Sequence, residues 1–184
     1  WQSEESMTIH YLHTYERLDR EFPIGGPVTL RRDTQYDYSR YRVQVSTANR
    51  RVLAITATVE TGGFYSGERD QLILDIGVRP RPGIVLYLFG DWNRIDLPQG
   101  TFTTRLYRTV LDTQFNPWIS LTNTLQYDSV STVLGWQSRF RWILTPGNDL
   151  YVVYSHNWLN DAMLDRFSTL NRWGASKISY TYRF

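Results

Sequence analysis

The 184-residue sequence lacks cysteine, has three histidines and contains no long apolar run. Without cysteine it has no disulfides, no thiolate metal sites and no cysteine nucleophile. Its longest apolar stretch, Ile84 to Phe89, is far shorter than the ~20 residues that a membrane-spanning helix needs. The net charge of +2 is too small to indicate nucleic-acid binding. These absences argue against a disulfide scaffold, a helical membrane protein and a nucleic-acid-binding protein.

Residues for catalysis are also scarce. On an extended strand His10 and His13 point to opposite sides, so they cannot hold one metal ion together. His156 follows the apolar side of its segment and is expected beside aromatic residues. A triad that recruits Ser129 or Ser155 is easily assembled by chance in a β-protein rich in Ser and Thr. No phosphate-binding glycine loop is present. We therefore predict a non-enzymatic protein without cofactor or metal.

Aromatic residues, by contrast, make up 15% of the chain, and apolar and polar residues alternate along most of it. Such alternation indicates β-strands with one apolar and one polar side. At the C-terminus Ile178, Tyr180, Tyr182 and Phe184 alternate with polar residues. A last strand that ends on an aromatic residue resembles the C-terminal signal of bacterial outer-membrane β-barrels.

The alternation predicts about ten strands. Most exceed the ~5–6 residues usual in soluble proteins and suit the ~9–11 residues of a tilted membrane strand. Their expected ranges are 7–18, 34–46, 51–61, 69–79, 84–95, 102–114, 118–128, 132–144, 149–158 and 175–184. The fold class is thus all-β, an antiparallel up-and-down meander forming one domain over residues 1–184. A β-barrel is favoured, with an open or sandwich-like sheet as the alternative.

The connections between these strands divide into two sets. Tight turns are expected at 47–50, 79–83, 115–117 and 145–148, which carry Asn, Pro or Gly. They are every second connection, so they lie at one end of the meander together with both chain termini. Longer connections are expected at the other end, at 19–33, 62–68 and 159–174. This asymmetry is typical of outer-membrane barrels, whose periplasmic turns are short.

Three local features depart from the simple pattern. Tyr36 and Tyr38 change sides relative to Tyr41, which predicts a bulge near Ser39–Arg40. Residues 102–114 have apolar side chains on both sides, which suits a sandwich or a protein contact. Residues 160–170 could form a short helix, although a structured loop is the favoured interpretation.

The two sides of the strands predict two surfaces. One would contact lipid or a protein partner; the other would face a narrow interior, where buried charges must be paired. Carboxylates such as Glu60, Asp75 and Asp91 could provide the pairing, and we favour an ionic plug over a selective pore. The lipid- or partner-facing residues are Trp118, Leu121, Leu125, Trp136, Phe140, Trp142, Trp158, Tyr180, Tyr182 and Phe184. The interior charged residues are Arg40, Arg42, Asp75, Arg79, Arg139, Arg141 and Arg183.

Two-thirds of the chain resembles the C-terminal β-barrel region of the DUF5916 proteins, bacterial envelope proteins that often carry an N-terminal family-9-like carbohydrate-binding domain. The matching segments are GGFYSGERDQL (62–72), VRPRPGIVLYLFGDWNRIDLPQGTFTTRL (78–106), LQYDS (125–129) and RFRWILTPGNDLYVVY (139–154). The resemblance implies an outer-membrane barrel segment and no known reaction. The sequence has no such binding domain, so sugar binding is not carried over. The chain is expected to be a C-terminal fragment or a shortened relative.

Two functions remain open. The chain could be a transport or scaffold barrel in the outer membrane of a Gram-negative-type bacterium, with lipid and the outer-membrane assembly machinery as partners. Alternatively, it could be an accessory structural subunit that docks on a larger membrane complex, with the periplasmic face of that complex as its place. Lipid contact predicts a continuous apolar belt with aromatic rims, whereas docking predicts one localised patch.

Overall fold

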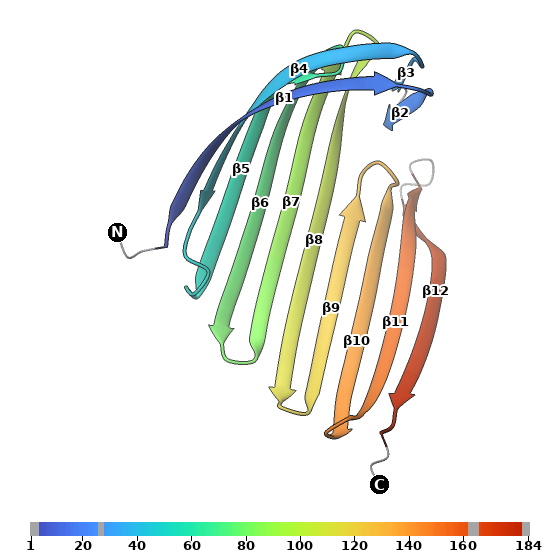
Figure 1. Ribbon diagram of the computed structural model, residues 1–184. Helices are drawn as coiled ribbons and strands as arrows, with labels where there is room; N and C mark the ends of the chain where they lie inside the picture. The colour runs from blue at the N-terminus through green and yellow to red at the C-terminus, as the bar shows by residue number, and fades with distance from the viewer. Residues whose placement is uncertain (1–3, 26–27, 162–165, 182–184) are drawn as a thin grey trace. The chain divides into compact units, whose positions relative to one another are not determined.

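The computed structural model describes residues 4–25, 28–161 and 166–181, and the main element is an antiparallel sheet of ten strands (Figure 1). The strands pair in the order β1-β4-β5-β6-β7-β8-β9-β10-β11-β12, with β1 and β12 at the two ends of the order. The described residues include no helix that is long and apolar enough to cross a membrane. The strands are β1 (Ser6–Leu18), β4 (Thr34–Ser46), β5 (Leu53–Phe64), β6 (Gly67–Arg81), β7 (Ile84–Leu97), β8 (Gly100–Asn116), β9 (Ile119–Asp128), β10 (Val133–Thr145), β11 (Asn148–Asp161) and β12 (Arg166–Ser179).

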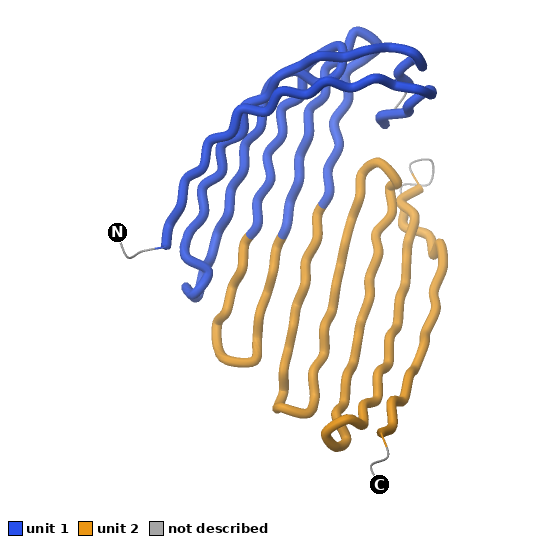
Figure 2. The backbone as a smooth tube through the Cα atoms, viewed as in Figure 1, with its two compact units in different colours: residues 1–75, 89–106 blue, residues 76–88, 107–184 orange. Residues whose placement is uncertain are grey.

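The antiparallel meander predicted from the alternation is confirmed. The chain divides into two compact units, one formed by residues 1–75 and 89–106, the other by 76–88 and 107–184 (Figure 2). The division falls within β6, β7 and β8, each of which contributes residues to both units. In the described residues β1 and β12 do not pair, so the sheet is not closed, and its closure into a barrel and its being a single domain stay predictions.

The connection expected at 19–33 contains a small hairpin. Its strands are β2 (Phe22–Gly25) and β3 (Val28–Leu30). Val28 is buried against Ile95 and Leu97 of β7, and the partly buried Phe102 packs on the same cluster. This contact explains one of the apolar side chains, Phe102, that give residues 102–114 two apolar sides. Strands of three or four residues are too short for a visible alternation, so the sequence did not reveal them.

Two other predicted loops are wrong. Residues 62–68 are mostly strand, because β5 ends at Phe64 and β6 begins at Gly67, leaving Tyr65 and Ser66 as the turn. Residues 159–174 belong largely to β11 and β12, so both the loop and the helix proposed for 160–170 are wrong where the structure describes them. The expected asymmetry of connections is lost as a result, since of the three connections expected to be long, only 19–33 lies outside the strands of the ten-stranded sheet where the structure describes it.

The last strand also differs from its prediction. β12 covers Arg166–Ser179 instead of 175–184, and Tyr180 follows its end. Tyr182, Arg183 and Phe184 lie outside the described residues. The pairing of β11 with β12 shifts register between Asn157 and Trp158. A bulge of this kind interrupts the alternation, so the pattern did not indicate a strand beginning before residue 175.

The bulge predicted near Ser39–Arg40 is absent from the pairing of β1 with β4, which runs from Thr34 to Ser46 without a register shift. Tyr38 therefore lies on the same side as Arg40, whose guanidinium carbon is 5.5 Å from the Tyr38 ring centroid. The sequence interpretation assumed that aromatic residues belong to the apolar side. Here the cation–π contact gives an aromatic residue a place on the polar side.

Candidate functional site

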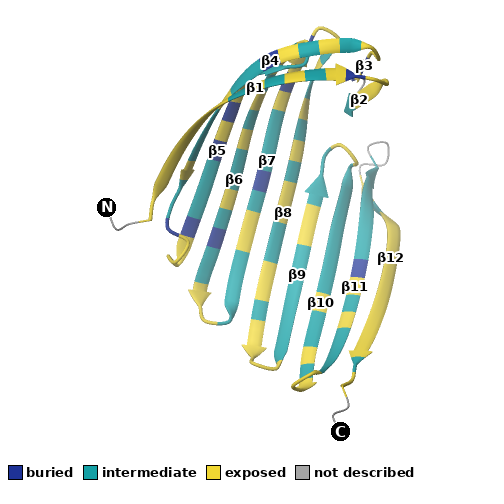
Figure 3. Ribbon diagram, in the orientation of Figure 1, coloured by how far each residue is buried: buried dark blue, intermediate teal, exposed yellow. Residues whose placement is uncertain are grey.

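The first unit has one apolar and one polar face. Met7 pairs with Val45, Ile9 with Val43 and Tyr11 with Tyr41 across β1 and β4, and Val43 pairs with Val59 of β5. We call this side the apolar face of unit 1. It is open to the surroundings, with 66% of Ile9 and 65% of Met7 exposed. Figure 3 shows the first half of β1 as a continuous exposed stretch and the second half as an alternation of exposed with less exposed residues.

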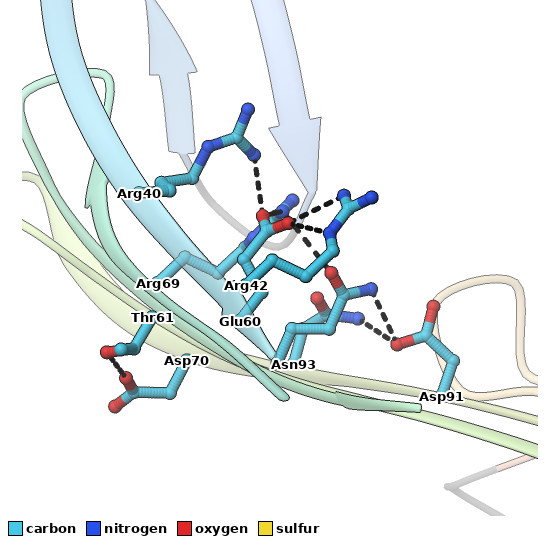
Figure 4. A network of polar contacts seen from close by, with 9 residues as sticks. Arg40, Arg42, Glu60, Thr61, Arg69, Asp70, Asp91 and Asn93 are labelled. Atoms are coloured by element: carbon cyan, nitrogen blue, oxygen red, sulfur yellow. Dashed lines mark hydrogen bonds and ion pairs between the residues drawn. The ribbon is translucent and has the colours of Figure 1, made fainter. Parts of the chain in front are cut away.

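The opposite side, the polar face of unit 1, is centred on a buried carboxylate. Glu60 of β5 is only 1% exposed. Arg40 Nη1 donates to Glu60 Oε1 over 2.9 Å, and Arg42 Nε donates to Glu60 Oε2 over 2.7 Å. Arg69 of β6 donates to Oε1 as well. Figure 4 shows the three guanidinium groups converging on this carboxylate from neighbouring strands.

The network continues through neutral side chains. Arg69 also donates to Gln71 Oε1, and Gln71 and Asn93 each donate to Asp91 Oδ1 over 2.9 Å (Figure 4). Buried charges are tolerated when partners and hydrogen bonds compensate for the lost hydration. Glu60 of β5 has such partners on the two strands that flank it, Arg40 and Arg42 on β4 and Arg69 on β6. The arrangement can hold these strands together, and it leaves Glu60 no free lone pair for proton transfer.

The predicted interior charges have different environments. Arg40 and Arg42 bind Glu60, one of the proposed partners. Asp91 accepts from amides instead, and Asp75 is exposed. Sequence reasoning missed Arg69, Gln71 and Asn93. For Arg69 and Gln71 the signal was spacing, since residues 69, 71 and 75 share one side of β6; Asn93 shares a side of β7 with Asp91 in the same way.

The second unit holds Arg79, Arg139 and Arg141 on its own polar side, while Arg183 lies outside the described residues. Arg141 Nη2 donates to Asp149 Oδ2 over 3.1 Å, and its guanidinium lies 5.4 Å from the Tyr151 ring centroid. Arg79 stacks in the same manner on Tyr87, at 5.9 Å. Arg139 is exposed. Aromatic rings thus serve as partners for cations here, which the expectation of carboxylate partners did not include.

The apolar face of unit 2 is formed by β9 to β12. Cross-strand pairing brings its residues together in rows, each row running across three strands. The rows are Ile119–Trp142–Leu150, Leu121–Phe140–Val152, Leu125–Trp136–His156 and Tyr127–Leu134–Trp158. Six of the residues predicted to face lipid or a partner therefore share one side. Trp118 precedes β9 and Tyr180 follows β12, and both are exposed. What this face contacts stays a prediction.

His156 lies within an aromatic row on that face. Its ring stacks on Trp158 with 3.9 Å between centroids, and Trp136 meets Tyr154 edge-on at 5.6 Å. One His156 ring nitrogen is 3.1 Å from the Thr169 hydroxyl. A stacked histidine of this kind extends the aromatic surface and has no carboxylate partner among these contacts.

A second polar cluster resembles a catalytic triad in composition only. His13 Nδ1 is 3.2 Å from Ser39 Oγ, and His13 Nε2 is 3.5 Å from Asp37 Oδ1. More than half of each of the His13 and Asp37 side chains is exposed, so water competes for both contacts. The Ser39 hydroxyl is also 2.8 Å from the Tyr11 hydroxyl. This exposure is typical of a solvated surface cluster and not of an activated nucleophile.

Aromatic residues also gather around the β5–β6 turn. Tyr65 contacts Tyr36, Tyr38 and Phe64, with ring centroids 4.8 to 5.7 Å apart. Burial, reinforced by the negative charge of Glu16, raises the pKa of Tyr65 to about 12. The phenol therefore stays neutral at any physiological pH. Its ring packs with the other aromatic rings at this end of the strands. No three His, Asp or Glu residues of the described chain are grouped to hold a metal ion.

Comparison with known proteins gives little beyond this geometry. No protein-family model matches the chain, and no curated protein matches it. Two solved structures are similar over 97% of the chain, a KdgM porin and a KdgM porin in complex with disordered oligogalacturonate. The alignments cover 99% and 96% of those chains, with 11% and 12% identity and a TM-score of 0.41 for both. A similarity at this level of identity and TM-score does not indicate function, which has to be inferred from the residues of this chain.

Proposed function

We propose that the chain is a non-enzymatic outer-membrane-type β-barrel, or the C-terminal part of one, and that it acts as a transport or scaffold element. Its place would be the envelope of a Gram-negative-type bacterium, with membrane lipid as its immediate partner. Strands of 10 to 17 residues in the ten-stranded sheet support the proposal, because they are long enough to cross a bilayer when tilted.

The proposal depends mainly on one observation: a charged side chain is buried while large apolar side chains are exposed. In unit 1 a glutamate is 1% exposed while an isoleucine of β1 is 66% exposed. Unit 2 also exposes large apolar side chains, with Trp118 at 47% and Ile178 at 72%. Large apolar side chains rarely form a continuous exposed surface on a soluble protein. A bilayer would cover such a surface and leave the polar face to the interior.

The alternative is an accessory subunit that docks on a larger membrane complex. Docking predicts a single apolar patch, whereas exposed apolar residues occur on both units, along β1, β4 and β5 of one and β9 to β12 of the other. This distribution favours lipid. Within the barrel function, the Glu60 cluster supports the scaffold role, because three arginines are held by one carboxylate.

A relationship to the DUF5916 barrel region is part of the proposal, and the segments quoted above support it. In the structure residues 62–72 include the β5–β6 turn, and residues 78–106 include β7 and the beginning of β8. Insertion of such a chain would require the outer-membrane assembly machinery.

The test is extraction of the native chain from membranes. An integral barrel resists alkaline and high-salt washing, and in gentle detergent it migrates alone, with a mobility that changes on boiling. A chain that is released by alkaline washing, or that co-purifies in fixed ratio with other subunits, would instead be the docked accessory subunit.

A further inference from the structure

The apolar face of unit 1 is hollowed near one end of its strands. A hollow of about 520 Å³ is lined by residues of β5, β6, β7 and β8. Most of its lining residues lie on the apolar side of their strands, and Glu60, Gln71, Asn93 and Thr104 of the opposite side also contribute to it. Thr61 donates to Asp70 over 2.6 Å and Thr101 donates to Asp96 over 2.7 Å, so these residues lie on the side opposite the Glu60 cluster. Val59, Leu72, Trp92, Arg94 and Arg105 have the same parity as these residues on their strands.

The floor of the hollow is apolar and aromatic. Val59 and Leu72 are 51% and 38% exposed, and they continue the apolar face towards this end. The Trp92 ring lies over Gly90, where any Cβ would collide with the indole. Gly90 thus allows the ring to lie flat on the sheet. Tryptophan is enriched at the boundary between hydrocarbon and headgroups, so a partly exposed indole in this hollow suits contact with the upper part of a lipid.

The rim of the hollow is charged. Arg94 and Arg105 are both exposed and both line it, while the carboxylate on the same rim, Asp70, accepts the Thr61 hydroxyl. Asp96, nearer the strand end, accepts from Thr101. Arg94 has no hydrogen-bond or ion-pair partner among the described residues. Guanidinium groups bind phosphate oxygens in a planar, bidentate geometry.

We propose that this hollow binds one anionic phospholipid of the surrounding leaflet, with its phosphate at Arg94 and Arg105 and its first acyl carbons against Trp92, Leu72 and Val59. The inference rests on the proposed membrane location and adds a specific lipid site to it. Charge decides the class of lipid, because on this side of the sheet the lining holds two arginines against one carboxylate, Asp70, and this excess of positive charge favours an anionic headgroup over a zwitterionic one.

The experiment is native mass spectrometry of the detergent-solubilised chain with phosphatidylglycerol or phosphatidylcholine. We expect phosphatidylglycerol to be retained preferentially, and the double variant Arg94→Gln/Arg105→Gln to lower its retention about tenfold, as expected for loss of a charge-assisted hydrogen bond. Arg139→Gln, which removes an exposed arginine from the polar side of unit 2, is the matched control and should retain lipid like the wild type. Arg94→Lys should retain an intermediate amount, because it keeps the charge without the fork geometry.

Equal retention of the two lipids, or an unaffected double variant, would overturn the lipid site. Excess inorganic phosphate should not displace the lipid; displacement would mean that the hollow binds a small anion and not an amphiphile. Each variant is first tested for alkali-resistant insertion and heat-modifiable migration. A chain that inserts but shows no lipid preference contradicts this inference alone, whereas a wild-type chain that does not insert contradicts the proposed function itself.

Discussion

Glu60 is the residue on which the polar face of unit 1 depends. Its carboxylate receives hydrogen bonds from Arg40, Arg42 and Arg69, and it is almost fully excluded from solvent. Removing one partner of a buried ion pair is costly, because the remaining charges lose compensation without regaining water. Here a single substitution would leave three guanidinium groups facing one another across neighbouring strands.

We therefore expect Glu60→Gln to lower the free energy of unfolding by about 3–5 kcal/mol, the cost of breaking a buried ion pair. The measurement is urea unfolding of the chain inserted in lipid vesicles, followed by tryptophan fluorescence. Glu5→Gln is the control, because Glu5 pairs with Arg51 at an exposed position and should contribute less than about 1 kcal/mol. A Glu60→Gln variant as stable as Glu5→Gln would show that the cluster does not hold the strands.

Tyr65 predicts a dependence on alkaline pH. Its pKa of about 12 lies above the ordinary value of 10.0, so the folded chain binds the phenolic proton more tightly than the unfolded chain. The stability that this provides is complete below pH 10 and is lost as the pH rises through 12. Unfolding free energies between pH 9 and 12 should fall more steeply for the wild type than for Tyr65→Phe. Parallel curves would contradict the burial of this phenol.

At the scale of the element, a single strand carries both faces, and neighbouring residues meet different environments. On β9, Leu125 pairs with Trp136 on the apolar face, while Gln126 pairs with Gly135 on the other side. Leu125 is 44% exposed in the isolated chain. In a soluble protein an arginine at such an exposed position would cost little, whereas in a membrane strand it would face hydrocarbon.

We expect Leu125→Arg to reduce stability by about 2–4 kcal/mol near the bilayer midplane, while Gln126→Arg is tolerated. Both variants are compared under identical conditions by their free energy of unfolding in lipid vesicles and by the fraction of protein whose mobility changes on heating. Equal behaviour of the two adjacent arginines would contradict a lipid-facing strand and would favour an apolar face that is covered only locally.

At the scale of the whole molecule, lipid contact and docking differ in how many aromatic residues meet the bilayer. The chain has seven tryptophans, and Trp136, Trp142 and Trp158 lie together on the apolar face of unit 2. Vesicles of brominated lipid should therefore quench most of the tryptophan emission. Emission that is unchanged on transfer from ordinary to brominated lipid would exclude the belt and leave the accessory subunit.

Much of the fold could be predicted from the sequence because strand alternation is a local property. Strands β4, β7 and β9 each begin and end within two residues of their predicted bounds. Elements that depend on other parts of the chain were missed. The β2–β3 hairpin is too short to show a period and is stabilised by packing on Ile95 and Leu97. The start of β12 is hidden by the register shift at Asn157.

For the candidate sites the sequence alone determined that two faces exist and which side of most strands each residue takes, since the period of two follows from backbone geometry. Only the tertiary structure decided which charges meet. Glu60 and Arg69 are nine residues apart in the sequence. The neighbours of Glu60 along β5 are uncharged, and those of Arg69 along β6 are acidic. Only the register between β5 and β6 therefore brings this glutamate and this arginine together. Register depends on the whole sheet, because shifting one strand by a single residue would exchange its two faces.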